Sequence, residues 1–182
     1  MRVTAFILTA ATLASACSNP APTEAPAATA STPSAPSPDR KYLLERIDDA
    51  AVVQLYADGF ASLPTQQKIL TWHLYQAALA GRDIFIDQKH RNALEMRGVL
   101  EQIVAHPAGV DPATLAEIRR YTKLFWLNSG PHNSQTARKF LLRCEPGALA
   151  AAARLAADAG ARLPLRPGET LDDVLERLGP CF

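Results

Sequence analysis

Four histidines are the side chains of this sequence best suited to bind a metal or to transfer protons: His73, His90, His106 and His132. A zinc site needs ligands at close helical spacing, such as i and i+4, or pairs supplied across a turn. These histidines are far apart along the chain, and the sequence contains no Cys-x-x-Cys pair. The sequence therefore predicts no metal ligand and no catalytic residue within this chain.

A polar loop near residue 130 is the best candidate for a binding surface. Asn128, His132 and Asn133, with neighbouring serine and glutamine side chains, gather hydrogen-bond donors and acceptors on one loop. One interpretation is that these three residues form a cleft loop. The alternative, which the pattern favours, is that the same groups satisfy a helix end and a turn.

The other histidines and a charged cluster have structural explanations. His73 lies in a helix that is apolar on all sides, which predicts a buried histidine with satisfied hydrogen bonds. His106 precedes a proline, which predicts a loop position. Arg82 and Asp83, with Asp87, are explained by an ion pair between helices.

Several functional classes are disfavoured by the sequence. Ser129 does not lie in the Gly-x-Ser-x-Gly turn that exposes a nucleophilic serine, and no glycine-rich phosphate loop is present. The formal net charge is +1 over 182 residues, which gives no electrostatic footprint for nucleic acid.

Helix start and stop signals predict a mainly α-helical fold with at most one or two short strands. The hydrophobic content of 48% is enough for one domain of ordinary size. Helices are predicted over residues 41–47, 62–81, 87–105, 111–128 and 146–159, with a last helix of about two turns from residue 170. Residues 51–56 form a short apolar run that predicts either a strand or a helix.

The predicted helix ends depend on capping residues, and the predicted faces depend on apolar spacing. The expected N-terminal signals are Ser62 with Pro64, Asp87, Asp111 with Pro112, and Thr170 with a reciprocal cap from Asp173. Gly81 and Gly160 are expected to end helices. One predicted buried face comprises Ala93, Met96, Val99, Leu100 and Ile103, and another comprises Leu115, Ile118, Tyr121, Phe125 and Trp126.

Two helices predict that the chain belongs to a larger body. In the helix over residues 64–80, the large apolar side chains point in nearly every direction, which is typical of a helix surrounded by protein. The last helix has a complete apolar stripe but is too short to be stable alone. Because the sequence ends soon after it, we expect the chain to be part of a longer protein.

The first 39 residues predict export. Residues 1–16 combine a positive start with a short apolar run, as in a secretory signal peptide, and Cys17 follows small residues, as in a lipidation site. Residues 17–39 then read as a lipidated cysteine and a disordered tether rich in Pro, Ala, Ser and Thr. The expected location is the cell envelope, lipid-anchored and facing the periplasm. The alternative is cleavage near residue 16, which gives a soluble periplasmic protein. If Cys17 is lipidated, Cys144 and Cys181 remain, and whether they pair is open.

Three segments of the body resemble a known family. They are LPTQQK at residues 63–68, QAALAGRDIFIDQ at residues 76–88 and YTKLFWLNSGPHNSQTARKF at residues 121–140. Within residues 47–142 the chain is similar to the N-terminal lobe of dipeptidyl peptidase III-like zinc exopeptidases. The resemblance implies a two-lobed protein that binds a peptide in the cleft between its lobes.

The zinc chemistry of that family is absent from this sequence. The resemblance implies that two histidines of a His-Glu-x-x-Gly-His motif and a later glutamate hold zinc, with the motif's own glutamate acting on the water. Neither the motif nor a substitute occurs here.

We therefore expect residues 40–182 to be an N-terminal fragment that is inactive alone. It would supply scaffold and the cleft loop, with zinc bound only in a full-length relative. Peptides are the expected partners, the membrane is reached only through the lipid anchor, and no nucleic acid is bound. The alternative is a non-catalytic helical envelope lipoprotein that acts as a binding or structural module.

Overall fold

The computed structural model describes residues 39–182. The predicted signal peptide, the lipidation site at Cys17 and the tether up to residue 38 lie outside the described residues. Among the described residues, no helix is both long and apolar enough to cross a membrane.

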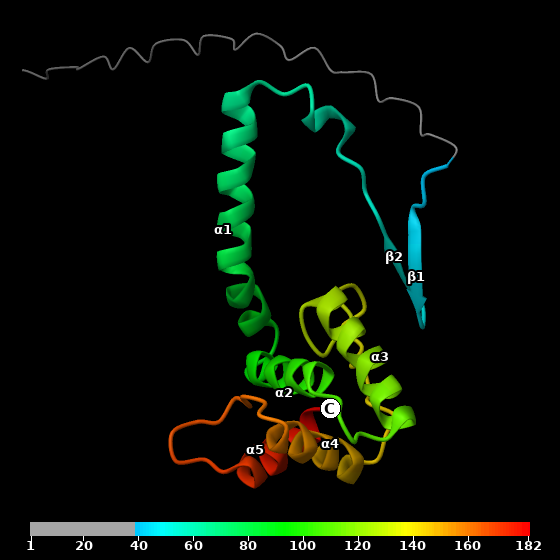
Figure 1. The fold of residues 1–182 in the computed structure, drawn as a ribbon, viewed down its shortest axis with the longest axis vertical. Helices are drawn as coiled ribbons and strands as arrows, with labels where there is room; N and C mark the ends of the chain where they lie inside the picture. Colours follow the sequence, from blue (N-terminus) through cyan, green and yellow to red (C-terminus); the bar gives the residue numbers. More distant parts are fainter. Residues whose placement is uncertain (1–38) are drawn as a thin grey trace, which may run out of the picture. The chain divides into compact units, whose positions relative to one another are not determined.

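The described part of the chain is mainly helical, as the sequence predicted, with five α-helices and one two-stranded antiparallel hairpin (Figure 1). The elements are β1 (Leu43–Ile47), β2 (Ala50–Val53), α1 (Thr65–Lys89), α2 (Ala93–Ala105), α3 (Pro112–Asn128), α4 (Pro146–Asp158) and α5 (Leu171–Leu178). Short 3-10 turns at Asp58–Phe60 and Gly179–Cys181 precede α1 and follow α5.

The hairpin corrects the helix predicted over residues 41–47. This segment is β1, and it pairs with β2 so that Ile47 lies opposite Ala50. Asp48 in the connecting turn has a φ of 53°, in the left-handed region that tight turns use. A seven-residue segment is too short for a stable isolated helix, whereas a strand partner only a few residues away is available. Of the ambiguous run over residues 51–56, only residues 51–53 are strand, as part of β2, and residues 54–56 lie outside it.

Helix α1 is longer than predicted. Gly81 does not end it, because a glycine in a helix interior costs only about 1 kcal/mol and its position here meets no neighbouring side chain. Asp87 lies inside α1 rather than capping the next helix, and α2 begins only at Ala93. Ser62 is not the N-cap either, because the N-cap position is Pro64, and the Ser62 hydroxyl donates to the carbonyl of Gly59.

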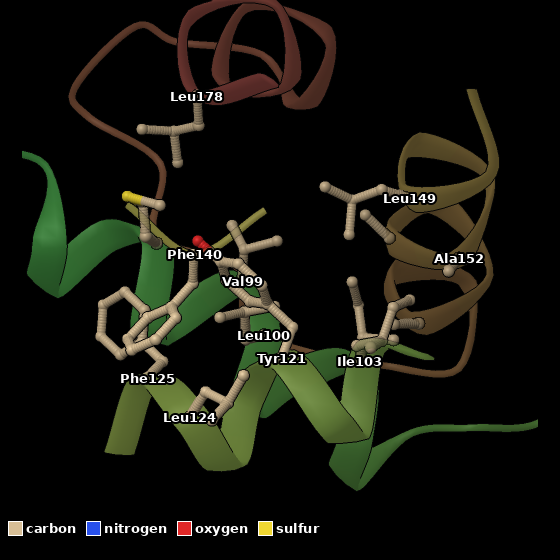
Figure 2. Packing of buried hydrophobic residues seen from close by; sticks show 14 of the residues in the cluster. Val99, Leu100, Ile103, Tyr121, Leu124, Phe125, Phe140, Leu149, Ala152 and Leu178 are labelled. Carbon is tan, nitrogen blue, oxygen red and sulfur yellow. The ribbon is translucent and has the colours of Figure 1, made fainter. Parts of the chain in front are cut away.

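The predicted face of α2 is confirmed and forms the centre of the core. Its five apolar residues are fully buried, and α2 packs on both α3 and α4. Figure 2 shows Val99, Leu100 and Ile103 meeting the side chains of α3. On α3, Ile118, Tyr121 and Phe125 are buried as predicted, with Leu115 only partly so.

Trp126 was wrongly assigned to that buried face. It is 48% exposed, and its indole nitrogen donates a hydrogen bond of 2.9 Å to a carboxylate oxygen of Glu101 on α2. Leu124 is buried in its place. A tryptophan can lie at the edge of a core because its N–H needs a polar partner.

Most of the other helix ends are confirmed. The carboxylate of Asp111 accepts a hydrogen bond of 2.8 Å from the backbone N–H of Thr114, which caps α3. Thr170 and Asp173 form the reciprocal cap of α5. Gly160 follows α4 with a φ of 91°, the left-handed conformation typical of a helix end.

Helix α5 docks on the body through the predicted stripe. Val174 and Leu178 are buried, and Leu175 is packed against the same core. A cavity of about 110 Å³ lies at this contact, lined by Val99, Leu142, Cys144, Pro146, Leu149, Ala150, Leu175, Leu178, Gly179 and Phe182.

Candidate functional site

The predicted cleft loop, residues 128–135, is held by hydrogen bonds to its own backbone. The side-chain amide of Asn128 donates to the carbonyl of Leu124 at 2.9 Å, and its oxygen accepts from the N–H of Ser134 at 3.0 Å. The side-chain oxygen of Asn133 accepts from the N–H groups of Gln135 and Thr136, each at 2.9 Å. Both asparagines thus stabilise the helix end and the turn, as the structural alternative expected.

His132, the third residue of the predicted cleft loop, has a different environment. Its backbone forms an isolated antiparallel bridge with Lys139, and its ring centroid lies 6.1 Å from that of His90. Sequence spacing did not predict this pair, because the two residues belong to segments that meet only through packing.

His90 is the more constrained histidine of the pair. It is the C-cap residue of α1, and its Nδ1 accepts a hydrogen bond of 3.2 Å from the backbone N–H of Asn92. Burial lowers the pKa of His90, and the positive charges of His132, Arg91 and Lys139 lower it further. His90 is therefore held in its neutral form.

The structure corrects the prediction for His73, which is exposed on α1 rather than buried in a core. His106 lies just after α2, as predicted for a residue that precedes a proline. Its Nδ1 is 3.0 Å from the carbonyl oxygen of Gln102.

The charged cluster on α1 joins two helices. The carboxylate of Asp83 accepts a hydrogen bond of 2.8 Å from Arg97 of α2, and Arg82 lies 3.5 Å from the same oxygen. The hydrogen bond from Arg97 holds the pKa of Asp83 below its usual range. Asp87 is exposed on α1. The ion pair between helices predicted as the structural explanation is therefore present for Asp83.

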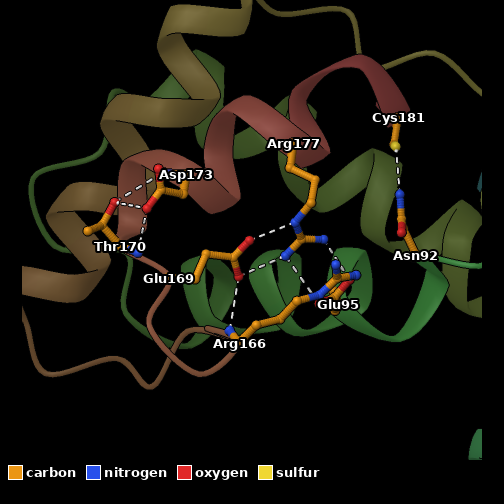
Figure 3. A network of polar contacts seen from close by, with 8 residues as sticks. All are labelled: Asn92, Glu95, Arg166, Glu169, Thr170, Asp173, Arg177 and Cys181. Carbon is orange, nitrogen blue, oxygen red and sulfur yellow. Dashed lines mark hydrogen bonds and ion pairs between the residues drawn. The ribbon is translucent and has the colours of Figure 1, made fainter.

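Two larger ion-pair networks were not predicted, because their members come from distant segments. Glu95 of α2 accepts hydrogen bonds from Arg166 and Arg177, and Arg177 also donates to Glu169 (Figure 3). The shortest contacts of Arg177 are 2.8 Å to Glu95 and 2.7 Å to Glu169. These bonds fasten α5 and the loop before it to α2.

The second network fastens the hairpin to α3. Arg120 donates to Glu117 at 2.6 Å and to Asp48 in the hairpin turn at 2.7 Å. Arg143 donates to the same Asp48 oxygen at 3.1 Å, and its backbone N–H donates to Glu117. Each arginine thus has carboxylate partners, so the network is structural.

No metal centre is assembled in the part of the chain that the structure describes, since no group of three or more His, Cys, Asp or Glu side chains could hold an ion. Cys144 and Cys181 are both free thiols. The side-chain amide of Asn92 donates to the sulfur of Cys181 at 3.3 Å, and burial raises the pKa of the Cys144 thiol.

The surface of α1 is mostly exposed although it is rich in large apolar side chains. Among its side chains, only Ile86 is buried. Eight large apolar side chains of this helix are between 42% and 65% exposed: Ile69, Leu70, Trp72, Leu74, Tyr75, Leu79, Ile84 and Phe85. Where α1 meets α2 and α3, the exposed rings of Phe85 and Trp126 line a groove of about 420 Å³.

No family model matches this chain, and a search of curated proteins found no match. The resemblance to dipeptidyl peptidase III-like enzymes therefore stays a prediction.

Proposed function

We propose that residues 40–182 form the helical N-terminal part of an exported dipeptidyl peptidase III-like zinc exopeptidase. In this proposal the segment contributes scaffold and a cleft loop, and it contributes no catalytic residue. The exposed apolar surface of α1 is the observation that carries the proposal.

The composition of α1 supports a protein environment on all of its sides. No Asp, Glu, Lys or Arg occurs between Lys68 and Arg82. Each exposed apolar side chain presents roughly 100 Å², about half of a large side chain's surface. Eight such side chains give on the order of 800 Å², which is one partner's share of a stable protein interface. A helix of this kind is normally buried within a larger body.

The cleft loop adds a second, weaker support. Its asparagines fix the backbone of residues 128–136, which leaves the exposed part of the loop in one defined conformation. A pre-organised loop of this kind suits the wall of a peptide cleft, because little ordering remains to be done on binding. The zinc ligands and the catalytic glutamate would come from outside the present sequence.

The alternative proposal is a helical envelope lipoprotein that binds a partner without catalysis. It is favoured by the completeness of the core around α2, which is closed by capped helices and two ion-pair networks. In that case α1 is the surface that the partner covers.

The size of the native protein distinguishes the two proposals. An antibody against residues 146–182 would be used on a cell-envelope fraction. The peptidase proposal expects a band several-fold larger than this chain, with zinc and dipeptidase activity in the purified product. A band at the length of this chain would overturn it and leave the lipoprotein proposal.

A further inference from the structure

Two histidines from separate segments meet at the junction between α1 and α2, where the ring of His132, from the loop after α3, lies 6.1 Å from that of His90. His90 is the C-cap of α1 and has an extended backbone, with φ of −162° and ψ of 133°. Helix α2 begins three residues later, and its first N–H, from Ala93, donates to the carbonyl of His90 at 2.8 Å. The geometry of His90 therefore sets the direction in which α1 leaves the body.

The hydrogen bond to the His90 ring requires a neutral imidazole. Its Nδ1 accepts from the backbone N–H of Asn92, so this nitrogen carries no proton. Protonation would place an N–H opposite an N–H and break the bond. His106 is a contrasting case at the end of α2, because its Nδ1 faces a carbonyl oxygen and donates to it whether or not the ring is charged.

The charged groups around His90 oppose a positive charge there. They are His132 and Lys139 from the loop after α3, and Arg91 from the start of the α2 segment. Lys139 is held in place by its hydrogen bond of 3.1 Å to the carbonyl of Pro180. Acid would therefore add charge to His90 beside Arg91 and Lys139, and Lys139 is held in place.

The loop that carries His132 also packs closely on the end of α1. A Cβ atom at Gly130 would lie 3.2 Å from the Cβ of Lys89, which is closer than most side chains tolerate. Repulsion between His90 and His132 would thus act on a tight contact between this loop and α1.

We propose that the His90–His132 pair makes the α1–α2 junction an acid-sensitive hinge. In acid, well below the ordinary histidine midpoint of about pH 6.5, protonation of His90 breaks the Asn92–His90 bond and separates the loop from α1. The end of α1 then loses its fixed direction relative to α2. This inference does not depend on the proposed peptidase function, since it uses only the described residues.

The direction of the effect follows from the pKa of His90. The folded state lowers this pKa, so the unfolded junction binds a proton more readily than the folded one. The stabilising contribution is complete above the ordinary histidine pKa, and it is lost as the pH falls through the lower, folded value. The hinge is therefore closed at neutral pH and opens in acid.

Amide hydrogen exchange on the full chain tests the hinge. Exchange at residues 86–94 would be compared at pH 7.5 and pH 5.5, after correction for the intrinsic effect of pH on exchange. We expect a severalfold loss of protection at pH 5.5 in this segment, while the centre of α2 stays protected. Unchanged protection of the segment would overturn the proposal.

Two variants and a matched control make the test specific to the pair. In His90→Asn, the side-chain oxygen can accept from Asn92 but cannot become charged, so the acid-induced loss should disappear. His132→Gln replaces the neighbouring imidazole with an uncharged side chain and should reduce the loss. This second variant keeps the test decisive if the first one fails to fold. His106→Asn is the matched control, and its acid-induced loss of protection at residues 86–94 should equal that of the original chain. An undiminished loss in folded His90→Asn or in His132→Gln would contradict the hinge.

Discussion

Asp83 of α1 and Arg97 of α2 are joined by a hydrogen bond of 2.8 Å between carboxylate and guanidinium. The arginine side chain is largely buried, while the aspartate is half exposed. The Nε of Arg97 is buried without a hydrogen-bond partner among the described residues. The same Nε lies 3.6 Å from a carboxylate oxygen of Glu101, and the Asp83–Arg97 ion pair is a polar link between α1 and α2.

Replacing Asp83 with Asn should loosen the second half of α1. The amide keeps the shape of the carboxylate but removes its charge, so the hydrogen bond from Arg97 is weakened. Amide exchange in residues 82–89 should become faster, while exchange in α2 changes little. Asp87→Asn makes the same chemical change at an exposed position of the same helix, and it should leave exchange unaltered. Equal effects of the two variants would mean that the hydrogen bond to Arg97 does not stabilise α1.

Because of Glu95, the free energy of unfolding of the body should decrease as the pH falls into the acid range. Its burial opposes ionisation most strongly, but hydrogen bonds from Arg166 and Arg177 together outweigh burial and lower its pKa. The ion pairs are complete above the usual carboxyl range and are lost as the pH falls through the lowered pKa. Urea unfolding followed from pH 7 to pH 3 should show this loss.

The matching variant is Glu95→Gln, which should cost about 2 kcal/mol at pH 7, because the four hydrogen bonds from Arg166 and Arg177 lose the carboxylate charge and one acceptor oxygen. Its stability should also change less than that of the original chain between pH 5 and pH 3. A variant with the original pH dependence would assign the acid effect to other carboxylates.

Local signals in the sequence predicted much of the helical body. Asp111 followed by proline, and Thr170 followed three residues later by Asp173, specify helix starts through contacts within one turn. The buried face of α2 also follows from spacing along one helix. These features need no knowledge of distant segments.

Features that depend on distant segments or on surroundings were missed. The hairpin was predicted partly as helix because strand pairing is not visible in the spacing of residues 41–47. His73 was expected to be buried because its helix is apolar all round, yet the part of the protein that the structure describes does not cover it. The contact between His90 and His132 arises only when α1, α2 and the loop after α3 pack together.

Tyr121→Phe should stabilise the body. The Tyr121 ring is fully buried, and its hydroxyl has no hydrogen-bond partner among the described residues. Burial raises the pKa of this hydroxyl, so it stays protonated and needs an acceptor. Removing it avoids the desolvation cost of an unpaired polar group and should add about 1 kcal/mol to the free energy of unfolding. Urea unfolding at pH 7 measures this change, and a loss of stability would show that the hydroxyl has a partner in solution.

Charged substitutions on α1 should show whether its apolar side chains are exposed to solvent or packed in the core of the isolated chain. Leu70 and Leu74 lie one turn apart on α1 and are 56% and 61% exposed. In the isolated chain, the double variant Leu70→Glu with Leu74→Glu should keep its helical content and its unfolding midpoint. Binding of an apolar dye should fall by roughly a tenth, since two of the 20 exposed large apolar side chains of the described residues are lost and such binding follows apolar area.

Leu100→Glu is the control, because it makes the same chemical change at a fully buried position of α2. A buried unpaired carboxylate there should cost more than about 3 kcal/mol and unfold much of the body. If the α1 double variant instead lost as much stability as Leu100→Glu, the apolar side chains of α1 would be packed within the isolated chain. The proposal that a larger body covers them would then lose its main support.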